Sequence, residues 1–313
     1  MSTWRHRGAP PAARGPRRPS HFDYSRVSLT FESDGTACAG WLYRPDGVER
    51  PPVVVMAGEL AAERRFGLRP YAERLAEAGY AAFLFDYRNV GDSDGEPRNL
   101  VAPDEQVDDW HAALEGLRER SEIDGNRLVL WGAGLSGGYA LRVAAEDTRV
   151  AAVVAQNPML DGSGVMGGRG VRGTLAALGA GVRDKLQSRF LGPHRVPVLG
   201  DGVSMAVFED PVVRGAYREL VPPGSTWRDE TPARVFLSMF RYRALSDPDD
   251  ITCPVLLVAG TRDELAPADD VASLADELTN ATLVELPAGH FDHYDRSFEQ
   301  TFGHLLSFLQ AVA

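Results

Sequence analysis

Near the middle of the chain the sequence reads Arg127-Leu-Val-Leu-Trp-Gly-Ala-Gly-Leu-Ser-Gly-Gly-Tyr-Ala-Leu141. An apolar run is followed by a glycine-rich turn and then by residues that suit the start of a helix. A buried strand, a sharp turn and a helix are the setting of the G-x-S-x-G motif, which holds a nucleophilic serine on a strained turn. The segment therefore predicts a strand, a turn and a helix that present the residue at the turn to a reactive site.

Two registers of this motif fit the segment. The literal match runs from Gly134 to Gly138 and makes Ser136 the nucleophile. The apolar run ends at Gly132, however, which puts the apex of the turn at Gly134 and Ser136 in the first helical turn. Residues two apart do not share a helix face, so a base aimed at the apex would miss the Ser136 hydroxyl. We favour the second register, in which glycine occupies the nucleophile position and relieves a strained turn, and keep Ser136 as the alternative nucleophile.

Composition favours an enzyme that acts on a small molecule. The chain has 313 residues, 44% of them hydrophobic, which is enough for one large core with an insertion. A formal net charge of −11 argues against nucleic acid or an anionic membrane as the main partner. The two cysteines, Cys38 and Cys253, lie far apart and predict neither a disulfide framework nor a metal site. We expect no cofactor and no metal, and the oligomeric state stays open, with a homodimer among the alternatives.

The first 21 residues are rich in arginine and proline and contain no acidic residue. They have no apolar segment of the kind found in secretory signals, so we expect residues 1–21 to form a disordered tail. No later stretch is apolar for the length that a membrane span requires. We therefore expect the protein in the cytoplasm.

Strands and helices alternate along most of the remaining chain, which predicts a doubly wound, mostly parallel sheet. A hairpin with an Asp34-Gly35 turn is predicted over Arg26 to Arg44. The further predicted strands are Val53 to Ala57, Ala81 to Phe85, Leu128 to Trp131, Val150 to Ala155, Pro254 to Val258 and Thr282 to Leu286. The predicted helices are Tyr71 to Ala78, Glu105 to Arg118, the one after the glycine-rich turn, Ala268 to Leu278 and Phe298 to Leu309. The core is thus assigned to residues 22–160 and 251–313.

The alternation stops between Asp161 and Asp250, where glycine-rich, proline-rich and amphipathic pieces such as Gly173 to Phe190 follow one another. We expect residues 161–250 to form a helical cap over the carboxyl ends of the strands, where ligands bind in such sheets. The glycine-rich run Gly167 to Gly170 has no strand before it, so it does not predict a phosphate-binding loop.

Several stretches resemble the dienelactone hydrolase and acetyl xylan esterase-like group of the α/β-hydrolases, from about Val27 onward. They are Phe85 to Gly95, Trp131 to Gly138, Gly260 to Pro267 and Gly289 to Tyr294. The resemblance implies an α/β-hydrolase fold, with His290 as the base of a catalytic triad and Asp263 as the acid that orients it. A loop histidine with ordinary hydrogen bonds and an Asp263 that caps the next helix are the structural alternatives. His293 and Tyr294 follow directly and line the pocket or pack.

The chain departs from this group a second time after its first core strand, where Gly58-Glu59 stands in place of His-Gly. By position, the oxyanion-hole amides would be those of Leu60 and Leu135. Glu59 beside them would oppose a developing negative charge unless it is protonated or turned away. We consider it a candidate second acid or base, and a solvated loop glutamate is the alternative.

A histidine supported by an aspartate, next to an oxyanion hole and without a nucleophile, can remove a proton but cannot form an acyl-enzyme. The predicted function is therefore a non-hydrolytic one, with His290 as general base. We expect a lyase that eliminates a carboxylate such as acetate, or a cyclase, acting on an acylated polyketide-type intermediate. An esterase that uses Ser136 or an activated water, and a silent ligand-binding homologue, are the alternatives.

Overall fold

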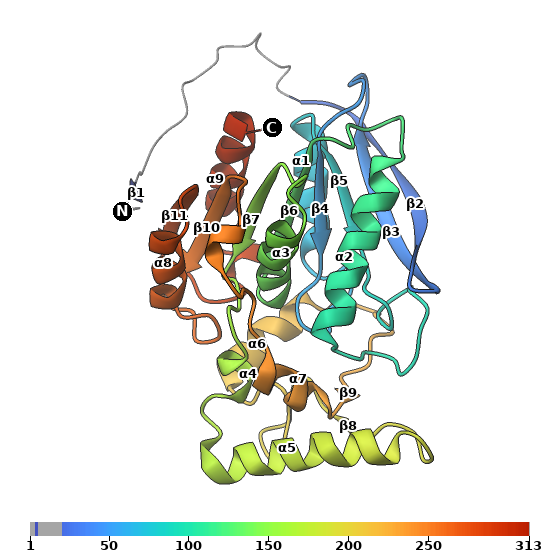
Figure 1. Ribbon diagram of the computed structural model, residues 1–313, viewed down its shortest axis with the longest axis vertical. Coiled ribbons are helices and arrows are strands. Elements are labelled where there is room, and N and C mark those ends of the chain that lie inside the picture. The colour runs from blue at the N-terminus through green and yellow to red at the C-terminus, as the bar shows by residue number, and fades with distance from the viewer. Residues whose placement is uncertain (1–3, 6–20, 313) are drawn as a thin grey trace.

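The computed structural model describes residues 4–5 and 21–312, which are built around a nine-stranded sheet (Figure 1). The strand order is β1-β11-β10-β7-β6-β4-β5-β3-β2. The strands from β11 to β5 run parallel, and β1, β3 and β2 pair antiparallel with their neighbours. Their bounds are β1 Trp4–Arg5, β2 Tyr24–Ser33, β3 Thr36–Pro45, β4 Val53–Ala57, β5 Ala81–Phe85, β6 Leu128–Ala133, β7 Ala152–Gln156, β10 Val255–Gly260 and β11 Ala281–Leu286. The prediction of a mostly parallel, doubly wound sheet is confirmed.

The central strands are short apolar runs because helices cover both faces of the sheet. Every residue of β4, β5, β6, β7 and β10 is buried. The predicted opening hairpin is present and is longer than expected, and its turn uses positive φ angles of 48° at Asp34 and 75° at Gly35. Two consecutive positive φ angles match the twist of a tight hairpin, and Asp-Gly adopts them readily.

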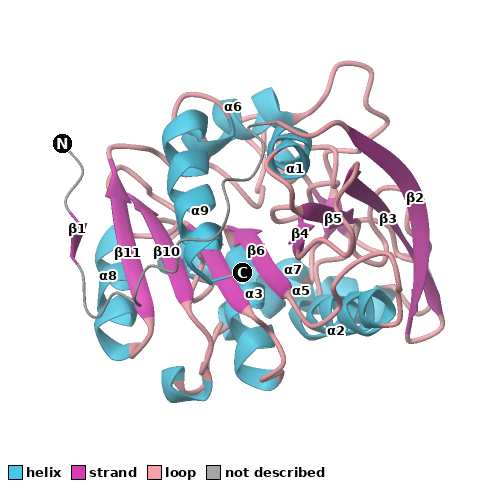
Figure 2. Ribbon diagram, turned by 90° about the horizontal axis from the view of Figure 1, so that it is seen from above, coloured by secondary structure: helices cyan, strands magenta, loops and turns pink. Residues whose placement is uncertain are grey.

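Helices flank the sheet on both sides (Figure 2). Helices α1 and α9 cover one face, and α2, α3 and α8 cover the other. Their bounds are α1 Leu68–Glu77, α2 Pro103–Arg118, α3 Leu135–Glu146, α8 Ala268–Glu277 and α9 Phe298–Val312. The predicted helices are confirmed, with ends that differ by up to three residues. Helix α2 begins two residues before the expected Glu105 because Pro103 suits a first helical position.

The chain between β7 and β10 forms a separate layer beyond one end of the sheet. It contains α4 Ser163–Met166, α5 Gly170–Gln187, β8 Arg195–Val196, α6 Pro211–Leu220, β9 Thr231–Pro232, α7 Val235–Arg241 and the 3-10 turn η1 Pro248–Asp250. Figure 1 shows α5 along the outer end of the molecule, with α6 and α7 between it and the sheet. We call this segment the cap. It lies at the carboxyl ends of the strands, because Tyr217 of α6 contacts the loop that follows β4.

Most of the expected disordered tail, residues 1–3 and 6–20, lies outside the described residues. Trp4 and Arg5 form the short strand β1, which pairs antiparallel with Leu283 and Val284 of β11. Within the part of the chain that the structure describes, no helix has the length and the apolar character needed to cross a membrane.

Candidate active site

Four loops meet where the parallel strands end, because the carboxyl ends of such strands share one edge of the sheet. Glu59 follows β4, Gly134 joins β6 to α3, Asp263 follows β10 and His290 follows β11. The structure therefore brings together residues that are widely separated in the sequence.

Asp263 and His290 form a hydrogen-bonded pair. The Nδ1 atom of His290 lies 2.7 Å from Oδ2 of Asp263, and both side chains are almost completely buried. The other oxygen of Asp263 accepts hydrogen bonds from the backbone N–H groups of Leu265 (2.7 Å) and Ala266 (2.9 Å). Asp263 is therefore fixed by its own loop, and it fixes the orientation of the imidazole in turn.

Glu59 lies on the opposite side of the same imidazole. Its Oε2 atom is 3.8 Å from Nε2 of His290, and its Oε1 atom accepts a hydrogen bond from the Tyr294 hydroxyl (3.1 Å). Glu59 is only 5% exposed, so the alternative of a solvated loop glutamate is wrong. The reason is that the loop after β4 is folded under the cap and not into solvent.

The two carboxylates determine the protonation of His290. Burial lowers the pKa of His290, but the charge and hydrogen bond of Asp263, together with those of Glu59, outweigh burial and raise it to about 10. The pKa of the neighbouring His293 is lowered to about 4, first by burial and then by the nearby His290 charge. His293 is completely buried and its Nδ1 contacts the Thr301 hydroxyl (3.0 Å), so it packs behind the site, whereas Tyr294 lines the pocket.

Gly134 stands between β6 and α3 with φ 56° and ψ −123°. A side chain is strained in this conformation. A Cβ atom at this position would overlap the Glu59 carboxylate and lie 2.9 Å from Nε2 of His290. The position thus faces the imidazole, as the favoured register expects, and the carboxylate of Glu59 fills the space next to it.

Ser136 lies in the first turn of α3 and is completely buried. Its hydroxyl donates to the Gly58 carbonyl. The Tyr87 hydroxyl, 2.6 Å away, donates to Ser136 and accepts from Trp110 Nε1 (2.9 Å). These contacts tie Ser136 into a core network, and neither of its partners is His290.

The two expected oxyanion-hole residues, Leu60 and Leu135, directly follow Glu59 and Gly134, which meet at the site. The N–H of Leu135 is the first of α3, so the helix itself provides no acceptor for it. The loop that carries Leu60 is held by the cap, because Tyr217 donates to the Leu60 carbonyl (2.8 Å) and Trp227 donates to the Ala61 carbonyl (2.9 Å).

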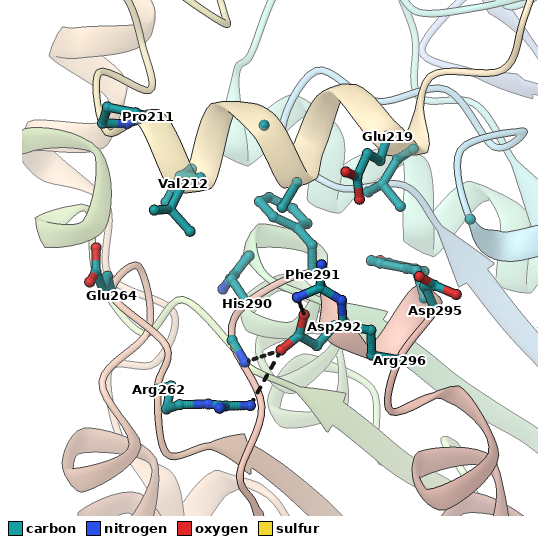
Figure 3. Close-up of a pocket in the computed structure, with 17 residues that line it drawn as sticks. Pro211, Val212, Glu219, Arg262, Glu264, His290, Phe291, Asp292, Asp295 and Arg296 are labelled. Atoms are coloured by element: carbon teal, nitrogen blue, oxygen red, sulfur yellow. Dashed lines mark hydrogen bonds and ion pairs between the residues drawn. The ribbon is translucent and has the colours of Figure 1, made fainter.

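A cavity of about 600 Å³ opens between α6 and the segment that carries His290 (Figure 3). The α6 wall is mostly apolar, with Val212 and Leu220 among its residues, and it also carries the carboxylate of Glu219. The opposite wall is polar, and there Arg262 lies 3.8 Å from Asp292. Cavities of this volume accommodate small organic ligands. A ligand in this cavity would reach the imidazole of His290.

Several contacts that support the site were not predicted from the sequence. Tyr294 was assigned no contact, yet it holds Glu59. Tyr217 and Trp227 of the cap clamp the loop after β4. Asn157, which follows β7, donates to the His290 carbonyl (3.1 Å) and accepts from the Gly260 N–H (2.7 Å). Only Asn157 carries a signal in the sequence, because a polar residue directly after a buried strand faces the ligand-binding edge.

No group of three or more His, Cys, Asp or Glu side chains suited to a metal ion occurs among residues 4–5 and 21–312. The site contains one imidazole (His290), two carboxylates (Glu59 and Asp263), one tyrosine hydroxyl (Tyr294) and backbone amides. This combination is suited to proton transfer.

Comparisons with known proteins agree with this architecture. The quorum-quenching protein AidA of Acinetobacter baumannii is 34% identical over 289 residues, which cover 91% of this chain and 95% of AidA. Thiohydrolase aneE of Aspergillus aculeatus is 27% identical over 84% of each chain. Polyketide transferase grgF of Penicillium sp. is 33% identical over 42% of this chain and 44% of its own. The crystal structure of the α/β-hydrolase GrgF aligns with a TM-score of 0.79 at 23% identity, over 91% of this chain and 98% of GrgF.

The family described as serine aminopeptidase, S33, matches residues 53–290, which span every loop of the candidate site. The narrower resemblance to the dienelactone hydrolase group stays a prediction. The sheet, the flanking helices and the family match together identify this chain as an α/β-hydrolase-fold member of the serine aminopeptidase S33 family.

Proposed function

We propose that this chain is a non-hydrolytic enzyme on an α/β-hydrolase scaffold, a lyase or a cyclase, in which Glu59 and His290 act as an acid–base pair. The observation that carries the proposal is the position of the Glu59 carboxylate. It fills the space beside Gly134 and faces Nε2 of His290 at 3.8 Å. A proton acceptor and a proton donor thus converge where a nucleophilic side chain would otherwise stand.

The roles of the pair follow from its charges. With a pKa of about 10, His290 holds its proton at neutral pH, so it is the donor and Glu59 is the acceptor. This assignment revises the expectation that His290 alone is the general base. Asp263 keeps the imidazolium charge balanced, and the amides of Leu60 and Leu135 would stabilise a developing enolate.

An elimination on an acylated substrate uses each of these groups once. Glu59 takes the proton from the carbon next to a carbonyl group, and the electrons of that C–H bond form the new double bond. The bond between the β-carbon and the acyl oxygen breaks, and the departing carboxylate receives a hydrogen bond or the proton from His290. No acyl-enzyme and no attacking water are required. In a cyclase, the same deprotonated carbon would attack a carbonyl carbon within the substrate.

The relatives support a substrate of the acylated polyketide type. A polyketide transferase and a thiohydrolase are among them, and the name of the first states a polyketide as what it acts on. The apolar residues that α6 contributes to the 600 Å³ cavity, such as Val212 and Leu220, suit the carbon chain of such a substrate.

The test is turnover of β-acyloxy carbonyl compounds in heavy-oxygen water, followed by mass spectrometry. Elimination gives an alkene that is lighter than the hydrolysis product by one water, and the released carboxylate carries no heavy oxygen. We expect Glu59→Gln and His290→Gln each to lose activity by a factor of about 100 or more, while Ser136→Ala keeps it. Heavy oxygen in the released carboxylate would refute the elimination.

A hydrolase is the second candidate, because the thiohydrolase matches 84% of this chain. In that case the Glu59 and His290 pair would activate a water that attacks the acyl carbon. The same labelling experiment separates the two reactions. A catalytically inactive ligand-binding protein would bind the esters without eliminating or hydrolysing them.

A further inference from the structure

A second pocket lies between the cap and the core, on the side of α2 and α3, and His290 does not line it. Its volume is about 300 Å³. Residues of the cap helices α5 and α7 form one wall, and the start of α2 together with α3 forms the other. We call it the basic pocket. It is lined by Asp104, Arg142, Lys185, Ser238, Arg241 and Arg243, among others.

Positive charge dominates this pocket. Arg142 is paired with Asp104 (2.7 Å) and Glu146 (2.8 Å). Lys185, Arg241 and Arg243 have no acidic partner within 4.0 Å in the part of the chain that the structure describes. All three residues are exposed, and they line the same concave site in a chain with a net charge of −11. An anion bound between them would be attracted by all three charges.

The start of α2 adds a second, independent feature. Helix α2 is 16 residues long and begins at Pro103, which lines the pocket. Its N-cap residue Ala102 has no side chain that could accept from the first helical N–H groups. The N–H groups of Asp104 and Glu105 are thus left without an acceptor inside the helix. The positive end of the helix dipole lies at this same end of α2. Free amides at a helix start bind anions.

We propose that the basic pocket binds a phosphate group. A phosphate monoester carries a charge of about −2 and several acceptor oxygens, which suit arginine forks, a lysine and the Ser238 hydroxyl together. A single carboxylate would balance only one of the three unpaired charges. Nucleic acid does not suit a pocket of this size in an acidic chain.

The ligand would join two parts of the molecule. Lys185, Arg241 and Arg243 belong to the cap, whereas Arg142 and the start of α2 belong to the core. A bound phosphate would therefore hold the cap against the core. This inference does not depend on the acid–base chemistry at Glu59 and His290, since the two sites have no residue in common.

The proposal is tested by titrating inorganic phosphate into the full chain by calorimetry, at an ionic strength held constant with chloride. Because each side chain would lose a charge-assisted hydrogen bond to the phosphate, we expect Arg241→Gln and Lys185→Gln each to weaken phosphate binding by about tenfold or more. Arg183→Gln is the matched control, because Arg183 is an exposed residue of α5 that does not line the pocket. It should change the affinity by less than about twofold.

Two results would overturn the proposal. One is phosphate binding that is as strong in the Lys185→Gln and Arg241→Gln double variant as in the unaltered protein. The other is a protein that responds to phosphate no more than to chloride. Thermal unfolding without phosphate shows that the variants are folded. A comparison of inorganic phosphate with coenzyme A then distinguishes a free anion from the phosphate of a larger acyl carrier, because tighter binding of coenzyme A indicates the second source.

Discussion

The carboxylate of Glu59 and a side chain at position 134 would occupy the same space. Gly134 has no side chain. A Cβ atom added to it would overlap the Glu59 carboxylate and would lie 2.9 Å from Nε2 of His290. The two residues are therefore compatible with each other, whereas a larger residue at position 134 would strain the backbone and collide with Glu59. The identity of residue 134 cannot be changed without consequences for residue 59.

Gly134→Ser by itself should not create a reactive serine. The new side chain would be strained at φ 56° and would collide with the Glu59 carboxylate. We expect a loss of stability of about 1–3 kcal/mol. We also expect little reaction with a fluorophosphonate, measured by intact mass.

The informative control is the Glu59→Ala, Gly134→Ser double variant. It frees the space and leaves His290 and Asp263 in place, so the fluorophosphonate should label the introduced serine. Labelling of the single variant as fast as the double variant would show that Glu59 does not fill the position.

Ser136→Ala should keep catalytic activity and lose stability. The hydroxyl of Ser136 donates to the buried Gly58 carbonyl, and the variant leaves that carbonyl without this donor. The expected cost is about 1–3 kcal/mol in the free energy of unfolding, measured with urea. Loss of turnover in a variant that is still folded at the assay temperature would favour the alternative in which Ser136 is the nucleophile.

The protonation of His290 should favour folding most strongly at low and neutral pH. Its pKa is raised from an ordinary value of about 6.5 to about 10 in the folded protein. The stability that it contributes is therefore fully present below about pH 6.5 and is lost as the pH rises through about 10.

Nuclear magnetic resonance of the imidazole rings measures this directly. The His290 ring should keep its proton well above pH 7, whereas the His293 ring should stay neutral until the pH approaches about 4. In Asp263→Asn the midpoint of His290 should move down. An unchanged midpoint in that variant would show that Asp263 does not hold the charge.

Tyr294→Phe should slow the proposed reaction by about tenfold, because the phenol donates to Oε1 of Glu59 and fixes its carboxylate. We expect kcat to fall more than KM rises. Tyr71→Phe is the matched control, since Tyr71 belongs to the same ring cluster but donates to the His293 carbonyl. Equal losses in both variants would assign the effect to packing of the rings.

Tyr217→Phe should loosen the contact between the cap and the core. It removes the 2.8 Å hydrogen bond from the Tyr217 hydroxyl to the Leu60 carbonyl, which lies in the loop next to Glu59. A buried carbonyl left without a donor costs about 1–3 kcal/mol. Faster hydrogen exchange of residues 59–62 would report the loosening, and unchanged exchange would contradict it.

The order of strands and helices could be predicted because each central strand is a short apolar run. The runs Val53–Ala57 and Ala81–Phe85 match the observed strands residue for residue. Helix ends were less well predicted, as α1 begins at Leu68 and not at Tyr71. The left-handed Gly67 before it also makes room for Tyr294, a contact between distant residues that no local pattern contains.

The candidate site was predicted in part. The pairing of Asp263 with His290 was expected from the resemblance to the α/β-hydrolases, and the structure puts the two side chains 2.7 Å apart. The surroundings of Glu59 were not predictable, because burial of a loop glutamate depends on the cap above it and on Tyr294, 235 residues away in the sequence.

The sequence by itself determined the sheet, the helices and the position of Gly134 at the turn, because these depend on local apolar runs and on the backbone freedom of glycine. Only the tertiary structure decided that Glu59 is buried against His290 and that Ser136 is held by Tyr87 and Gly58. It also decided that three cations of the cap meet the start of α2. Charge and burial are set by neighbours that are distant in the chain, and only folding brings those neighbours together.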